Sequence, residues 1–282
     1  MRRIAGFLFL CFCLIRLSAQ SVQEELPRAM NEGTLIGAGT SHVKDTYLSP
    51  FNYSGWGVRI LNERMKMIGS GNGDFSRQQI INVDISSTKN PAENVNDFGA
   101  FVDYSLGYHY RLDVVPGFSV LTGASAHLLG GFIYNTRNGN NPLSAKIDLD
   151  LGLSLITLWN FRIKKLPLTL RYQAELPFAG VFFSPEYGAS YYEMFNLGNL
   201  SDVVAFNSFH NKFALRNYLT VDIPLYSFTL RLGYLNSLYY SDTKNIKTHV
   251  ISNSFMIGWV KEFIPLGSKR IKYKDRVRSS YY

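Results

Sequence analysis

Strict alternation of apolar and polar residues, sustained over unusually long stretches, dominates this chain. Between Leu143 and Ile163 one face gathers leucine, isoleucine and tryptophan, whereas the other gathers serine, lysine, aspartate and glycine. The same period of two recurs between Phe98 and Leu112. A helix repeats about every 3.6 residues and could not bury such a set on one side, so the pattern predicts β-strands.

Ten segments carry this alternation, and a strand is expected in each. They lie at residues 33–44, 55–68, 78–87, 98–112, 117–134, 143–163, 168–176, 213–223, 228–240 and 251–263. Strands in globular proteins usually have about five or six residues, and most of these are far longer. A tilted strand needs about 9 to 11 residues to cross a bilayer, so the lengths favour a transmembrane barrel. The longer link near residues 69–77 leaves twelve strands as an alternative.

The links between the strands alternate in length. Short links are expected at residues 113–116, 164–167 and 224–227, and longer ones at residues 135–142, 178–207 and 241–247. Outer-membrane barrels alternate short periplasmic turns with longer external loops in this way, and an even number of strands returns both termini to the periplasm. The predicted fold class is therefore all-β, a transmembrane antiparallel up-and-down β-barrel of about ten strands.

Alternation alone does not decide which face points outward, because a soluble lipocalin-like barrel has an apolar interior and a polar exterior. Aromatic residues gather near the strand ends of the apolar face, as in the interfacial girdles of membrane barrels. These aromatic residues are Tyr108, Tyr110, Trp159, Phe161, Trp259 and Phe263. The girdles favour an apolar face toward lipid, with a soluble lipocalin-like binding barrel as the alternative.

The N-terminal residues have the pattern of a cleaved secretory signal: two arginines, an apolar stretch too short to span a bilayer, and a small-residue site at Ala19. We expect a signal peptide at residues 1–19, a periplasmic segment at 20–32, the barrel at 33–263 and a basic periplasmic tail at 264–282. This organisation predicts a location in the cell outer membrane.

Composition and charge remove several classes of function. Cys11 and Cys13 both fall in the signal and are the only cysteines, so the mature chain has no thiol for a disulfide, a metal site or a nucleophile. The formal charge of +8 comes from the signal and the tail, which leaves the barrel near neutrality and does not suggest nucleic-acid binding. The tail is expected to be solvated, with an acidic periplasmic partner or anionic cell-wall material as the alternative.

Two short motifs mark the start of the predicted barrel. They are GTLIGAG at residues 33–39 and TYLSP at residues 46–50, followed by Tyr53 and Gly55. Over residues 33–64 the sequence resembles the opening of a family of outer-membrane barrels of unknown function from Gram-negative anaerobes of the Bacteroides and Prevotella type. The resemblance implies the location and the fold, but no activity and no functional residue.

The polar face of the predicted barrel gathers ionisable residues of both signs. The candidate lumen residues are Asp103, His109, Arg111, Lys146, Asp148, Asp150, Arg171, Glu175 and Arg216, with His127, Arg162, Lys212, Asp222 and Arg231 on the same face. Opposite charges in a narrow lumen are expected to pair, because charges away from bulk water need partners. A selective pore would instead need a ring of one sign, and the sequence shows none.

A catalytic grouping is conceivable on the same face. Ser125 and His127 share the inward side of one predicted strand, and Asp148 and Asp150 share that of the next. This arrangement makes an outer-membrane hydrolase of lipids or peptides an alternative. A serine two residues from a histidine arises readily by chance, and no histidine spacing resembles a metal site. We therefore predict no catalytic residue, metal or cofactor.

The long link at residues 178–207 is the strongest candidate for a binding site. Its aromatic residues are Phe182, Phe183, Tyr187, Tyr191, Tyr192 and Phe195. Long loops are usually functional or disordered, and exposed aromatics bind sugars or partner proteins. Alternatively, these rings pack on one another or on lipopolysaccharide. The predicted function is a non-enzymatic barrel for surface binding or small-solute passage, in contact with outer-membrane lipid, lipopolysaccharide and the barrel-assembly machinery.

Overall fold

The structure is a computed structural model that describes residues 30–68, 74–198, 202–225 and 228–263. The predicted signal peptide and basic tail lie outside the described residues. No helix among the described residues is long and apolar enough to cross a membrane. The elements are β1 (Met30–Asp45), β2 (Tyr53–Ile68), β3 (Phe75–Lys89), β4 (Asn96–Val115), β5 (Phe118–Asn135), β6 (Leu143–Ile163), β7 (Leu166–Phe183), α2 (Tyr191–Phe195), β8 (Val204–Ser208), β9 (Lys212–Pro224), β10 (Thr229–Thr243) and β11 (Ile246–Phe263).

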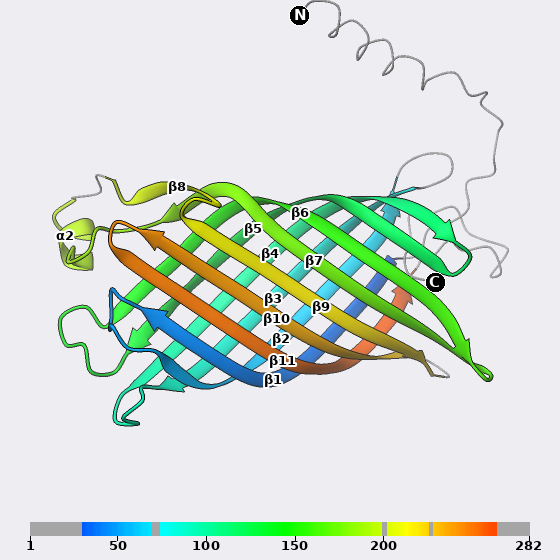
Figure 1. Cartoon of the computed structure of the whole chain (residues 1–282), viewed down its shortest axis with the longest axis horizontal. Helices are drawn as coiled ribbons and strands as arrows, with labels where there is room; N and C mark the ends of the chain where they lie inside the picture. The colour runs from blue at the N-terminus through cyan, green and yellow to red at the C-terminus, as the bar shows by residue number, and fades with distance from the viewer. Residues whose placement is uncertain (1–29, 69–73, 199–201, 226–227, 264–282) are drawn as a thin grey trace, which may run out of the picture.

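Ten of these strands close into an antiparallel barrel (Figure 1). Consecutive strands pair with each other, β1 pairs with β11 to close the wall, and β7 pairs with both β6 and β9. The short strand β8 is additional, because it pairs only with the last residues of β7, Ala179–Phe183. The prediction of a ten-stranded antiparallel barrel is confirmed, with one extra strand that the sequence pattern did not indicate.

The apolar face of the strands points outward. On β6, Ile147 and Leu149 are each 54% exposed, whereas their neighbours Asp148 and Asp150 are buried. A soluble lipocalin-like barrel has the opposite arrangement. The outward face is therefore the one that matches lipid, as the aromatic girdles indicate.

One predicted long link is a tight turn. Residues 241–247 were expected to form a loop, but β10 continues to Thr243 and β11 begins at Ile246. Lys244 and Asn245 make the turn, and both have positive φ values, of 52° and 63°. A two-residue hairpin with a type I′ turn requires this left-handed backbone at both central positions. The expected long loop at this position is wrong because the hairpin closes with only two residues.

The two ends of the barrel differ. Figure 1 shows α2 and β8 at one end, which we call the loop end, and the start of β1 and the end of β11 at the other, which we call the turn end. Under the predicted topology the loop end faces the outside of the cell. At the turn end, β1 begins at Met30 rather than at Gly33.

The link between β1 and β2 folds over the mouth at the loop end. Tyr47 and Leu48 are buried there among apolar residues from several strands. This lid cluster consists of Val43, Tyr47, Leu48, Tyr53, Val95, Ile133 and Ile246. The Thr46 backbone N–H donates to the Lys247 carbonyl at 3.0 Å, which ties the link to the neighbouring hairpin of β10 and β11.

Candidate functional site

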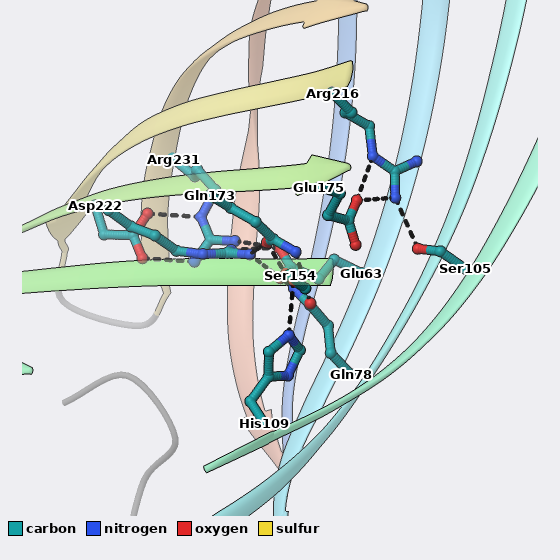
Figure 2. Close-up of polar contacts among 11 residues, drawn as sticks. Glu63, Gln78, Ser105, His109, Ser154, Gln173, Glu175, Arg216, Asp222 and Arg231 are labelled. Atoms are coloured by element: carbon teal, nitrogen blue, oxygen red, sulfur yellow. Dashed lines mark hydrogen bonds and ion pairs between the residues drawn. The ribbon is translucent and has the colours of Figure 1, made fainter. Parts of the chain in front are cut away.

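A network of buried charges crosses the middle of the lumen. Glu63 on β2 accepts hydrogen bonds from Arg171 on β7 and from Arg231 on β10, at 2.7 and 2.8 Å. Arg231 also forms a two-pronged contact with Asp222 on β9, with both N–O distances 2.6 Å (Figure 2). All four side chains are almost completely buried. Two cations face two carboxylates, so this central network is formally neutral.

Amides and apolar side chains fill the space around the central network. Gln78 donates to Glu63 at 2.5 Å and Gln173 donates to Gln78 at 2.8 Å, while Arg171 lies over the ring of Tyr218. Leucine, isoleucine and methionine side chains pack around Tyr218, and a second apolar cluster follows toward the turn end. The second cluster consists of Met65, Leu121, Ile156 and Leu158. Ion-paired, amide and apolar side chains therefore pack against one another in the middle of the barrel.

A second set of charges lies between the central network and the lid cluster. Arg216 on β9 contacts Glu175 on β7 and Asp103 on β4, the latter at 2.5 Å. Lys212 on β9 contacts both Asp148 and Asp150 on β6, at 2.6 and 2.7 Å. The remaining pairs join Lys146 to Asp45 and Arg59 to Asp84. All of these side chains except Asp45 and Glu175 line a cavity of about 120 Å³, which we call the chamber.

Most of the predicted lumen residues do face inward. Asp103, His109, Lys146, Asp148, Asp150, Arg171, Glu175 and Arg216 point into the barrel, as do His127, Lys212, Asp222 and Arg231. Arg111 is partly exposed and pairs with Asp113 near the turn end. Arg162 is exposed, so its predicted place in the lumen is wrong. The register gives the reason, because pairing of β5 with β6 ends at Trp159 and residues beyond it lie on a projecting hairpin.

The sequence analysis missed several partners of these charges. Arg59 and Glu63 both lie on β2 and both point inward. Their strand carries polar residues on its two faces, including Asn62 and Arg64, which point outward and bond to β1. The one usable signal is that Trp56 and Ile60, at even positions of this strand, are apolar and exposed. Because side chains alternate between the two faces, the odd positions, Arg59 and Glu63, then point into the lumen.

The predicted neighbours Ser125 and His127 do contact each other. The Ser125 hydroxyl lies 2.8 Å from Nε2 of His127, and both residues are buried. Asp150 is the cross-strand partner of His127, but its carboxylate contacts Lys212 instead. In the described residues no carboxylate hydrogen-bonds to His127, so the orienting group of a catalytic triad is missing. His109 makes a similar contact with Ser154, also at 2.8 Å (Figure 2).

No group of three or more His, Cys, Asp or Glu side chains within the described ranges is arranged to hold a metal ion. The ionisable side chains of the lumen instead contact one another across strands. In the described structure these side chains form ion pairs with one another.

The loop end carries the short helix α2, which is held by a cap at its N-terminus and by a hydrogen bond to β6. Ser190 caps α2, its hydroxyl accepting from the Glu193 backbone N–H at 3.2 Å while the Glu193 carboxylate accepts from the Ser190 N–H at 2.9 Å. The Ser190 N–H and the Ser190 hydroxyl both donate to the Glu193 carboxylate, which holds the pKa of Glu193 below its usual range. Tyr191 accepts from the Ala145 backbone N–H at 2.6 Å, which ties α2 to the start of β6.

A shallow groove of about 750 Å³ runs between α2 and the link that joins β5 to β6. One wall is formed by Ser190, Tyr191, Tyr192 and Glu193, and the other by residues 139–143, which include Asn140 and Asn141. The second wall is held by Asn138, whose side chain accepts from the Asn141 N–H and donates to the Leu48 carbonyl.

The six predicted loop aromatics fall into three groups. Tyr187, Tyr192 and Phe195 are each 63% exposed, as a binding surface requires. Phe182 and Phe183 belong to β7, and Phe182 is buried over the Lys212 ammonium group. Their predicted place in an exposed loop is wrong, because β7 extends past Leu176 and pairs there with β8. Tyr191 is half-buried against the lid cluster.

Comparison with known proteins yields one family match. A family described as "Protein of unknown function (DUF3316)" matches residues 7–270. No curated protein matches the chain. The source organisms implied by the resemblance of residues 33–64 stay a prediction.

Several solved outer-membrane barrels are similar to the chain at low identity. The outer membrane protease OmpT from Escherichia coli is 6% identical, with 87% of this chain and 99% of OmpT covered and a TM-score of 0.43. The β domain of the Bordetella autotransporter BrkA is 10% identical, with coverages of 83% and 100% and a TM-score of 0.42. The transport unit of the autotransporter AIDA-I from Escherichia coli is 9% identical, with coverages of 87% and 93% and a TM-score of 0.40. Similarities at this level transfer no activity to the chain.

Proposed function

The chain belongs to the DUF3316 family of proteins of unknown function, and we propose that it is a non-enzymatic surface-recognition barrel of the outer membrane that binds a glycan segment at its loop end. The observation that carries the proposal is the groove between α2 and residues 139–143. Its location, its chemistry and the closed lumen beneath it all support binding at the surface.

The packed lumen favours surface binding over the passage of solutes. Glu63, Arg171 and Arg231 join three strands through contacts of 2.7 to 2.8 Å, with apolar clusters on the sides. A solute would have to separate these buried charges, and breaking a buried ion pair costs about 3 to 5 kcal/mol. Planar-bilayer recordings of the purified protein should therefore show no stable conductance steps, and regular steps would support the alternative of small-solute passage.

The chemistry of the groove suits a glycan. The Tyr192 ring is exposed and offers an apolar face to the C–H groups of a sugar ring, while Asn140 and Asn141 carry amides that both donate and accept hydrogen bonds. Glu193 is the one charged side chain among the groove residues and is engaged in capping α2. A neutral ligand rich in hydroxyl groups matches this combination better than a charged peptide does.

The groove is also rigid, which lowers the ordering cost of binding. Tyr191 fixes α2 to β6 and Tyr47 donates to the Ala189 carbonyl at 2.7 Å. Asn138 fixes the opposite wall. Neither wall has to fold when a ligand arrives.

An oligosaccharide array probed with the full-length protein in detergent tests the proposal. Replacing Tyr192 with alanine should weaken binding by about 2- to 10-fold, the range expected for loss of one stacking ring. Tyr187 provides the matched control, because it is equally exposed on the same link but does not line the groove. Absence of binding to any oligosaccharide, or equal effects of Tyr192→Ala and Tyr187→Ala, would contradict the proposal.

A further inference from the structure

The ion pairs at the chamber include more carboxylates than cations, although two of the carboxylates, Asp45 and Glu175, do not line the cavity and instead pair with the lining cations Lys146 and Arg216. The carboxylates are Asp45, Asp84, Asp103, Asp148, Asp150 and Glu175, and the cations are Arg59, Lys146, Lys212 and Arg216. Six negative groups against four positive ones leave a formal surplus of two negative charges. The central network below the chamber is neutral and does not offset this surplus.

Several acceptor atoms that line the chamber have no partner in the described structure. Oδ1 of Asn82, Asp103, Asp148 and Asp150 is buried and accepts no hydrogen bond, and these four acceptors outnumber the two lining donors without a partner, Nε of Arg59 and the Tyr239 hydroxyl. Asn82 is not part of the acidic group, and its side chain is at least nine-tenths buried. Buried acceptors without donors are costly, so the chamber matches a guest that supplies N–H or O–H groups.

These acceptors are arranged in a row. Asn82, Asp103, Leu129 and Asp148 are successive cross-strand partners on β3, β4, β5 and β6, and all four line the chamber. Adjacent strands are about 4.8 Å apart, so the backbones of Asp103 and Asp148 lie roughly 10 Å apart. Leu129 stands between the two carboxylates. Along the row, the apolar side chain of Leu129 therefore lies between hydrogen-bond acceptors on either side.

From this row we propose that the chamber binds a short aliphatic diamine, with one ammonium group at Asp103 and Asn82 and the other at Asp148 and Asp150. Two positive charges balance the formal surplus, and the hydrocarbon between them packs on Leu129. A chain of about four carbons spans the interval once both aspartate side chains reach inward. The size also fits, since a cavity on the order of 150 Å³ accommodates benzene and the chamber has about 120 Å³.

A single metal ion fits the same charges less well. The chamber-lining carboxylates with unpartnered oxygens lie on β4 and β6, on either side of Leu129. Among described residues no three His, Cys, Asp or Glu side chains converge closely enough to ligate a metal. Two separated sites for ammonium groups match this spacing directly.

Thermal unfolding and native mass spectrometry of the full chain test the proposal. Because the lid cluster packs against Phe101 and Val250, which line the chamber, the protein is refolded in detergent in the presence of the probe. The probes are 1,4-diaminobutane, the monoamine butylamine and the uncharged 1,4-butanediol. We expect 1,4-diaminobutane to bind at least about tenfold more tightly than butylamine, from its second charge-assisted contact, and 1,4-butanediol, which donates O–H groups but carries no charge, to bind most weakly of the three.

Variants locate the site. Asp103→Asn and Asp148→Asn should each reduce the affinity for 1,4-diaminobutane to about that of butylamine, whereas Asp242→Asn should have no effect because Asp242 is exposed in a rim ion pair with Lys247. Equal binding of the three probes by the unaltered protein would overturn the proposal and indicate a chamber filled by water alone. The probe series uses no variant, so this outcome is decisive even if a substitution prevents folding. Glycan binding at the groove is measured separately and does not depend on the result.

Discussion

The Glu63 carboxylate on β2 and the Arg171 guanidinium on β7 meet across the lumen, with Oε2 2.7 Å from Nη1, although 108 positions separate them in the sequence. Because Arg231 binds the same carboxylate from β10, one glutamate joins three parts of the wall. These contacts link strands on different sides of the barrel, and their contribution to the free energy of unfolding can be measured.

Replacing Glu63 with glutamine should destabilise the folded barrel by about 3 to 5 kcal/mol, because the buried Arg171 loses its carboxylate partner. Urea unfolding in detergent micelles measures the change in the free energy of unfolding. Glu32→Gln is the control, since Glu32 pairs with the exposed Arg64, and a surface pair contributes only about 0 to 1 kcal/mol. Similar losses in the two variants would show that the central network does not brace the barrel.

The direction of the barrel in the membrane can be tested with single cysteines. An even number of strands places the loop end outside the cell if the N-terminus starts in the periplasm. A cysteine at position 190 should therefore react with a membrane-impermeant reagent on intact cells, and one at position 279 should not. Ser190 lies beside the groove, whereas Ser279 belongs to the predicted periplasmic tail. Labelling at position 279 without labelling at 190 would reverse the topology.

The capping box of α2 should resist moderate acid. Hydrogen bonds from Ser190 lower the pKa of Glu193 in the folded state, and a carboxylate with a lowered pKa stabilises the fold above its unfolded pKa. That contribution is fully present above the usual glutamate range of about 4.3 and is lost as the pH falls through the lowered value. The Ser190 amide resonance should follow this titration in NMR spectra. In a Glu193→Gln protein the titration should disappear, and its persistence there would assign it to another group.

Hydrolysis tests the enzymatic alternative. Since His127 lacks a carboxylate partner among the described residues, we expect peptide and lipid-ester hydrolysis by the purified protein to stay at background. Ser125→Ala and His127→Ala should leave that background unchanged. Ser154→Ala is the matched control, because it removes the similar contact with His109. Activity that is lost in the Ser125 and His127 variants but kept in the control would establish an enzyme.

The sequence by itself determined the strands, their approximate number and the two faces of each, and the aromatic residues near the strand ends indicated which face points outward. Alternation between residues such as Leu149 and Asp150 is a local property, and strand geometry converts it directly into two faces. The length of each strand is also a local property, and strands this long indicate that they span a membrane. These features therefore needed no knowledge of which strands are neighbours.

Only the tertiary structure decided which inward residues meet. Glu63 pairs with Arg171 because closure of the barrel and its register bring β2 opposite β7, and neither is encoded in the period of a single strand. Register also explains Arg162. Its position in the alternation predicts an inward side chain, but β5 no longer pairs with β6 beyond Trp159, and Arg162 is exposed. The groove, too, depends on distant segments, because Tyr191 reaches Ala145 across the loop end. Local pattern fixes the direction of a side chain, but the partner it meets is set by how the sheet closes.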